Sequence, residues 1–323
     1  MLKSNYPSPA RSRAIFYGIR NEVCSIQITL LPSTGGSSNL RLWVYQKGSC
    51  VWRHASHDGV INHHAGQFKD IWLTLLEQCP HTLADNTTVI MSGMIGSNIG
   101  WVDSHYLLCP VSLQTLSQHL TQVHDAGHLP VFIIPGLQLA GSETCNVMRG
   151  EETQLLGALS ENSWYAFPGT HSKWVRMEND TVRDFQTIMT GEFFHLLTRH
   201  SIVGKHATVQ QHNVDAFLAG AKRGQHENCL SRGVFDLRAR TLSHILPQDA
   251  LFDALSGLLI GHEIAQMLQH YAIPAHEEIV LVGSDELLVR YQTVFQLFGQ
   301  RCRLLNGETA FINGIRSVLH EHP

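Results

Sequence analysis

The stretch Pro168-Gly169-Thr170-His171-Ser172-Lys173-Trp174 decides how this chain is organised, because it joins two β-rich segments through small and hydroxyl-bearing residues. Residues 164–167 before it and 173–177 after it have the composition of strands, so we predict a strand, a turn and a second strand. Glycine permits close backbone approach, and successive N–H groups of such a turn form a concave anion site. The candidate phosphate-binding residues of this turn are Gly169, Thr170, His171, Ser172 and Lys173.

A similar turn, from Thr34 to Arg41, stands near the start of the chain. It too lies between segments predicted as strands, at 26–31 and 40–44. Its candidate phosphate-binding residues are Gly36, Ser37, Ser38 and Asn39. A single turn of glycine and serine is usually only a turn. Two of them, heading two similar halves, favour a nucleotide held between two domains that each contribute one phosphate-binding hairpin.

Each half continues from its hairpins into alternating helices and strands. In the first half, apolar residues at 68, 71, 72, 75 and 76 have the spacing of an amphipathic helix, residues 89–91 and 131–134 are short buried strands, and 113–124 is helix-like. The elements expected late in the chain lie at 191–200, 249–271, 279–282, 286–298, 302–305 and 309–320. We therefore predict an α/β protein with domains at 24–161 and 162–323, preceded by a disordered tail at 1–23.

Composition excludes several classes of protein. Among 323 residues there are 23 basic and 27 acidic side chains, giving a net charge of −4, and 43% of the residues are hydrophobic. This content supports a packed core and excludes disorder, collagen and coiled coil. No basic cluster or apolar run of about 20 residues is present, so we expect no nucleic-acid or membrane partner. Seven scattered cysteines indicate reduced cytoplasmic thiols, and the 21 histidines form no zinc motif.

An acidic pair, Glu151-Glu152, follows Arg149 and Gly150 at the start of a predicted helix. A carboxylate held on a rigid helix can accept the proton of an attacking hydroxyl, as phosphoryl transfer requires. Acids at this position are also favoured by the helix dipole alone. Arg149 has the shape to bind a carboxylate through two hydrogen bonds, or it is a surface residue.

Two glycine-containing loops follow predicted strands, where α/β proteins place ligands. The loop from Met91 to Trp101 offers Ser97 and Asn98 as hydrogen-bond donors, although it also suits a plain structural loop. Gly283 and Ser284 follow the strand at 279–282 and precede a helix. That position suits a sugar or phosphate, as well as any strand–helix connection.

The motifs of this chain together resemble those of the 2-dehydro-3-deoxygalactonate kinases, in the superfamily of sugar kinases, actin and Hsp70 ATPases. The resemblance runs from about residue 36 to the end of the chain, and its central motifs are specific to the family. The matching stretches are SSNLR (37–41), SGMIGS (92–97), NVMRGEETQLLG (146–157), PGTHSKWV (168–175), TGE (190–192), SGLLIG (256–261) and GETAF (307–311).

The resemblance implies two ribonuclease-H-like domains with ATP in the cleft between them. It implies transfer of the γ-phosphate to the C6 hydroxyl of 2-dehydro-3-deoxy-D-galactonate, in galactonate catabolism in a bacterial cytoplasm. Mg²⁺ would bridge the phosphates and neutralise their charge. A homodimer would be unsurprising for such a kinase.

The resemblance also implies roles for the candidate residues. The turn at 36–39 is similar to the first phosphate motif, the turn at 169–173 to the second, and Gly283 and Ser284 stand at the adenosine motif. Glu151 is the first candidate for the general base, with Glu152 next. The candidates for binding the sugar acid are Arg41, Ser97, Asn98 and Arg149.

The first phosphate motif departs from the family. The family motif begins Asp-Trp-Gly, whereas here the aspartate and tryptophan positions fall on Thr34 and Gly35. That aspartate helps to hold the metal, and a threonine brings no charge, so no metal ligand is assigned from the sequence. The alternative to an active kinase is therefore a degenerate member that binds nucleotide or sugar acid with little or no turnover.

Overall fold

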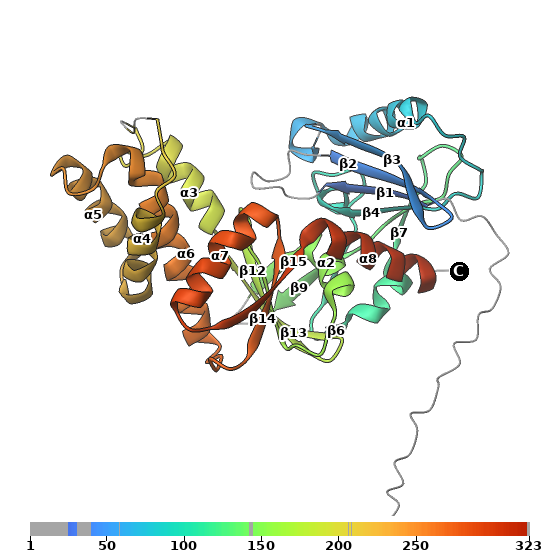
Figure 1. The fold of residues 1–323 in the computed structure, drawn as a ribbon. Coiled ribbons are helices and arrows are strands. Elements are labelled where there is room, and N and C mark those ends of the chain that lie inside the picture. The colour runs from blue at the N-terminus through green and yellow to red at the C-terminus, as the bar shows by residue number, and fades with distance from the viewer. Residues whose placement is uncertain are drawn as a thin grey trace, which may run out of the picture.

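The computed structural model describes residues 25–30, 40–57, 59–141, 145–205, 207 and 209–321. Figure 1 shows three parts in a row: a sheet with helix α1 at one end, a second sheet in the middle, and a group of helices at the other end. The predicted tail at 1–23 and the first turn at 34–39 lie outside the described residues.

The first sheet has the strand order β3-β2-β1-β4-β8-β7. Strands β1, β2 and β3 are antiparallel neighbours, and β1, β4 and β8 are parallel neighbours. Helix α1 (Phe68–Gln78) buries Phe68, Trp72 and Leu75, as its apolar spacing predicts. The strands are β1 (Ser25–Leu30), β2 (Leu40–Gln46), β3 (Ser49–Ser56), β4 (Val89–Gly93), β7 (Thr121–Val123) and β8 (Val131–Ile133).

The second sheet has the order β15-β14-β11-β12-β13-β6 and repeats the same plan. Strands β11, β12 and β13 are antiparallel neighbours, and β11, β14 and β15 are parallel neighbours. Five strands of each sheet therefore correspond in order and direction, which confirms the predicted α/β fold of two ribonuclease-H-like units. The strands are β6 (Val111–Ser112), β11 (Trp164–Phe167), β12 (Ser172–Glu178), β13 (Thr181–Ile188), β14 (Glu278–Gly283) and β15 (Arg301–Asn306).

The boundary between the two domains, at residues 161 and 162, remains a proposal. Strand β11 of the second sheet begins directly after it, at Trp164. One segment of the first half crosses this division, because the short strand β6 pairs with β13 at the edge of the second sheet.

Two helices join the sheets at close range. Helix α2 (Glu151–Ala158) contains Gly157, and helix α8 (Gly307–Glu321) contains Ala310. A Cβ atom added to Gly157 would lie 1.8 Å from the Ala310 carbonyl oxygen. Glycine is therefore required at this crossing, because any side chain would separate the helices. Leu155 of α2 and Phe311 of α8 share one buried cluster with Trp43 of the first sheet.

The helices α3 (Thr190–Arg199), α4 (Val214–His226), α5 (Leu230–Leu242) and α6 (Leu251–His270) lie beyond the second sheet (Figure 1). Helix α7 (Asp285–Leu297) packs on the second sheet, since its Leu288 and Tyr291 share a buried cluster with Ile279 and Leu281 of β14. Helices α4 and α5 are absent from the elements expected from sequence. Gly220 and Gly224 weaken the helical signal of α4, but both positions meet the backbone of α6 so closely that a side chain would not fit.

A stretch expected to be helix-like, 113–124, is only partly so. Residues Leu113–His119 form the 3-10 helix η4, and the chain then extends into β7, which pairs with β8. Backbone pairing at the sheet edge therefore overrides the apolar spacing. The other 3-10 helices are η1 (Val60–Asn62), η2 (Ala65–Gln67), η3 (Met94–Gly96) and η5 (Gln248–Ala250).

A third sheet, of order β10-β9-β5, completes the described structure. Its strands are β5 (Tyr106–Leu108), β9 (Gly136–Ala140) and β10 (Cys145–Met148), none of which the sequence patterns predicted. In the parts of the chain listed above as described, no helix is long and apolar enough to cross a membrane.

Candidate active site

Helix α2 begins where the two halves of the chain meet. Its N-cap, Gly150, has a φ of 109°, a conformation that favours glycine and turns the chain sharply out of β10. Glu151 then reaches Lys173 of β12, with 3.1 Å between Oε1 and Nζ. The two side chains are 12% and 7% exposed. The Lys173 ammonium also donates to the His171 carbonyl at 2.9 Å. The structure thus joins a candidate base from one half to a candidate phosphate ligand from the other.

Glu152 lies on the opposite side of the helix start and is fully buried. Its Oε2 accepts from the Gly150 N–H at 2.7 Å, and its Oε1 accepts from the Thr153 and Ser92 hydroxyls at 3.1 and 3.4 Å. Burial and the nearby charge of Glu151 raise the pKa of Glu152 to about 7, despite these hydrogen bonds. Glu152 therefore faces the protein interior, whereas Glu151 faces the junction of the two halves.

The second turn, at residues 168–174, is held by a hydrogen bond within the turn and by contacts with α3. Its Gly169 N–H donates to the Ser172 hydroxyl at 3.4 Å, and His171 contacts Glu192 of α3. Gly191 at the start of α3 lies so close that a Cβ there would be 2.5 Å from the Gly169 carbonyl oxygen. Thr170 Oγ1 is buried and has no hydrogen-bond partner. A buried hydroxyl without a partner is costly, so this atom is a candidate contact for a ligand.

A cavity of about 420 Å³ opens beside this turn, between helices α3, α6 and α7. Gly169 and Thr170 form part of its wall. Residues of α7, the helix that follows Ser284, form another part. Gly283 and Ser284 are not lining residues themselves. The lining residues are Gly169, Thr170, Thr190, Gly191, Phe194, Gln210, Gln211, His212, Phe252, Asp253, Ser256, Leu259, Ile260, Glu286, Leu287, Arg290 and Tyr291.

A polar cluster on the cavity wall has no counterpart among the residues expected from sequence. Asp253 lies 2.7 Å from Arg290 Nη2, 3.2 Å from His212 Nδ1 and 2.6 Å from the Asn213 N–H that donates to it. Burial alone would raise the pKa of Asp253, but the Asn213 N–H and Arg290 outweigh burial and hold the pKa below its ordinary value. These residues stand in no motif, so only their packing brings them together.

Arg149, at the end of β10, is buried beside the third sheet. Its guanidinium donates to the Ser104 carbonyl at 2.6 Å and to the Ser104 hydroxyl, and lies 4.3 Å from the centre of the Tyr106 ring. Its Nε atom is buried without a partner. Arg149 is therefore not a free surface residue, and its aromatic and hydrogen-bond contacts hold it in one orientation.

The other candidates for the sugar acid divide into two places. Ser97 and Asn98 follow η3, and a Cβ on neighbouring Gly96 would lie 3.0 Å from Arg149, so this loop and Arg149 are adjacent. The Ser97 hydroxyl donates to the Met94 carbonyl at 2.7 Å. Arg41 instead lies 3.7 Å from Glu308, at the start of α8.

The candidates of the first turn, Gly36, Ser37, Ser38 and Asn39, and the departing residue Thr34 lie outside the described residues. Within the described ranges, no three His, Cys, Asp or Glu side chains converge as a metal site would require.

Comparison with known proteins places the chain in a family. Residues 35–318 match the family model of 2-keto-3-deoxy-galactonokinase. The chain is 40% identical to the 2-dehydro-3-deoxygalactonokinase of Escherichia coli (strain K12), over 88% of this chain and 95% of the relative. The crystal structure of a proposed 2-dehydro-3-deoxygalactonokinase from Sinorhizobium meliloti is 30% identical and superimposes with a TM-score of 0.80, covering 92% of this chain and 96% of that one. The resemblance noted in the motifs is thus confirmed, and the chain belongs to the 2-keto-3-deoxy-galactonokinase family of phosphotransferases.

Proposed function

We propose that this protein transfers the γ-phosphate of ATP to the C6 hydroxyl of 2-dehydro-3-deoxy-D-galactonate, as a cytoplasmic step of galactonate degradation. The observation that carries the proposal is the second turn, whose Gly169 and Thr170 line the cavity and whose Lys173 forms an ion pair with Glu151. Family membership supports a sugar-acid kinase, and this arrangement supplies a place for each part of the reaction.

ATP would lie with its adenosine in the cavity and its phosphates along the second turn. Thr170 Oγ1 has no protein partner and would donate to a phosphate oxygen. Lys173 would move its ammonium charge from Glu151 to the γ-phosphate, where negative charge accumulates during transfer. The Asp253–Arg290 pair offers polar contacts on the cavity wall to the ribose or the base.

Magnesium would supply charge neutralisation on the phosphates. The described residues offer no protein-held magnesium site, since no three suitable ligands converge and the first turn has Thr34 where the family has aspartate.

Glu151 is the proposed general base. The oxygen of the C6 hydroxyl forms a bond to the γ-phosphorus, its proton passes to Glu151, and the bond from the γ-phosphorus to the bridging oxygen of ADP breaks. Glu152 is less suited to this role because it is fully buried and its oxygens already contact the Gly150 N–H and the mutually bonded Ser92 and Thr153 hydroxyls. Its buried position at the start of α2 is suited to holding this end of the helix in place.

The sugar acid would bind on the side of the third sheet. Arg149 and the adjoining loop with Ser97 and Asn98 provide a guanidinium and two hydrogen-bonding side chains beside the start of α2. A guanidinium is well matched to the carboxylate of the substrate. Arg41 is the weaker candidate because it already forms an ion pair with Glu308.

A coupled assay of ADP release tests the proposal. ADP release should require both ATP and a 2-keto-3-deoxy sugar acid, with the galactonate derivative preferred over its epimers in a panel. Absence of release with every sugar acid, together with nucleotide binding, would indicate the degenerate alternative. In that case Thr34→Asp should restore turnover with little change in sugar-acid affinity, which would trace the loss to the missing metal ligand.

A further inference from the structure

Glu263 is a buried carboxylate that the reaction as proposed does not use. It lies in the middle of α6 and is 2% exposed. Its Oε1 accepts from the Trp174 indole N–H at 2.9 Å, and its Oε2 accepts from the Tyr291 hydroxyl at 2.6 Å and from the Thr190 hydroxyl. Within the described chain no Lys, Arg or His forms an ion pair with it. Burial raises the pKa of Glu263 above its ordinary value, and the converging donors, in place of a cation, oppose that shift.

The hydrogen bonds around Glu263 have a defined direction. Tyr291 has one hydroxyl proton and gives it to Glu263, so the 3.1 Å contact between Tyr291 and Ser172 places the donor on Ser172. The Ser172 oxygen in turn accepts from the Gly169 N–H at 3.4 Å. A single chain of donors therefore runs from the backbone of the second turn to the Glu263 carboxylate.

The donors around Glu263 come from the walls of the cavity. Tyr291 belongs to α7 and Thr190 to the start of α3, and both line the cavity beside Gly169 and Thr170. Glu263 itself is not a lining residue. It lies behind the wall and accepts hydrogen bonds from residues of β12, α3 and α7.

We infer that Glu263 is a positioning residue for the nucleotide: its carboxylate orients Tyr291, Ser172 and Thr190 and thereby holds the second turn in place beside the cavity. The inference rests on the proposed function only in taking the ligand to be ATP or ADP. Negative charge matters here, because all the groups that face the carboxylate are donors.

Glutamine at this position would have the same shape but the wrong hydrogen-bonding pattern. If its NH₂ group replaced Oε1, it would face the Trp174 N–H, a donor against a donor. If the NH₂ group replaced Oε2, the Tyr291 and Thr190 hydroxyls would have to accept hydrogen bonds instead of donating them. The direction of the hydrogen-bond chain that starts at Ser172 would then be lost. Glu263→Gln therefore tests the charge and leaves the volume unchanged.

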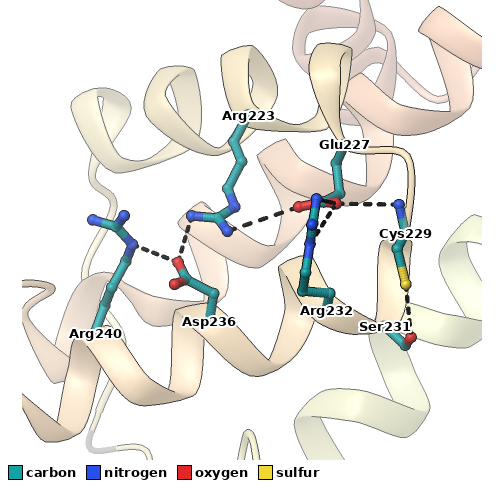
Figure 2. A network of polar contacts seen from close by, with 7 residues as sticks. All are labelled: Arg223, Glu227, Cys229, Ser231, Arg232, Asp236 and Arg240. Carbon is teal, nitrogen blue, oxygen red and sulfur yellow. Dashed lines mark hydrogen bonds and ion pairs between the residues drawn. The ribbon is translucent and has the colours of Figure 1, made fainter.

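Glu227 provides a matched control in the same domain. It is 5% exposed and accepts from Arg232 Nη2 at 2.7 Å and from the Cys229 N–H at 3.1 Å, in the polar network that joins the end of α4 to α5. Figure 2 shows this network, in which Arg223 connects Glu227 to Asp236. None of these residues lines the cavity. Glu227→Gln thus removes a buried, hydrogen-bonded carboxylate without touching the second turn.

The experiment measures Mg·ADP affinity by calorimetry and the KM values for ATP and for the sugar acid. For Glu263→Gln we expect Mg·ADP affinity to fall and KM for ATP to rise by about tenfold, because the hydrogen bonds to Glu263 that orient Tyr291, and through it Ser172 of the turn, are weakened. The KM for the sugar acid should stay within about twofold, and Glu227→Gln should leave all three values within about twofold.

Ser172→Ala is the second variant, in case Glu263→Gln does not fold. It leaves all three donors of Glu263 in place and cuts the chain next to the turn, so Mg·ADP affinity should fall about threefold or more. Wild-type Mg·ADP affinity in either variant would overturn the inference, as would an equal rise of both KM values or the same loss in Glu227→Gln. A wild-type protein that binds Mg·ADP but phosphorylates no sugar acid would instead defeat the proposed function and leave this inference standing.

Discussion

The ammonium group of Lys173 lies 3.1 Å from Oε1 of Glu151, and these two largely buried side chains come from opposite halves of the chain. Lys173 belongs to the hairpin of the second sheet, and Glu151 begins the last helix of the first half. The pair places positive charge for a phosphate beside a carboxylate for a hydroxyl proton. Phosphoryl transfer requires both at one point, so this contact locates the proposed chemistry.

Removal of the base should lower turnover and leave binding largely unchanged. For Glu151→Gln we expect kcat to fall by about 10²–10⁴, the range for loss of a general base, with KM for ATP and for the sugar acid within about threefold. Steady-state kinetics of ADP release would measure this. Glu152→Gln is the comparison, and a larger kcat loss there than in Glu151→Gln would reverse the assignment.

Thr170→Val should weaken nucleotide binding without a cost in stability. The Thr170 hydroxyl has no partner in the protein, so its loss breaks no internal hydrogen bond, and valine keeps the branched shape. We expect Mg·ATP affinity to fall by about fivefold to tenfold, with Tm unchanged or slightly higher. A lower Tm with unchanged affinity would show that the hydroxyl serves the fold instead of the ligand.

Stability should decrease as pH rises through the range in which Glu152 titrates. Burial and Glu151 raise its pKa from 4.5 to about 7 in the folded protein, so between these values the folded state holds a proton that the unfolded chain has released. The free energy of unfolding therefore falls by up to roughly 3 kcal/mol between about pH 4.5 and about pH 7. Above about pH 7, Glu152 causes no further change in it.

Glu152→Gln removes this titration and should flatten that part of the pH profile. Urea unfolding of both proteins from pH 4.5 to 8 would measure the difference, with the variant gaining on the wild type as pH rises. Parallel profiles would show that Glu152 is not the group responsible.

Gly157→Ala should separate α2 from α8. The added Cβ would lie 1.8 Å from the Ala310 carbonyl oxygen, a backbone atom that cannot rotate away. We expect a loss of about 1–3 kcal/mol or more in the free energy of unfolding, measured by urea denaturation. Gly66→Ala is the matched control, since nothing lies within 4 Å of its added Cβ, and it should change stability by less than about 0.5 kcal/mol.

The hairpins, the parallel strands and the late helices were predictable because local pattern determines them. Strands β11 and β14 are short apolar runs, and α8 has regular apolar spacing, so each is recognisable alone. Helix α4 was missed because its glycines lower helix propensity and make sense only against α6. The 113–124 stretch was misjudged because β7 exists through its pairing with β8.

The candidate site likewise contains residues that sequence motifs reveal and residues that only the fold brings together. The second turn and the Glu151-Glu152 pair stand out as motifs, and their residues are neighbours in sequence. Asp253, Arg290 and His212 on the cavity wall are far apart in the chain and belong to no motif. Glu263 is likewise one acid among 27 Asp and Glu residues, until three donors from separate elements converge on it.

The sequence by itself determined the duplicated α/β plan, the turn between two strands at 168–174 and the family, because each depends on residues close together in the chain. Only the tertiary structure decided which of two adjacent glutamates faces the junction, which lysine forms an ion pair with it, and where a cavity opens beside the second turn. Burial and distance between remote residues set these properties. A side chain's neighbours, not its position in the sequence, determine whether its charge is exposed, paired or buried.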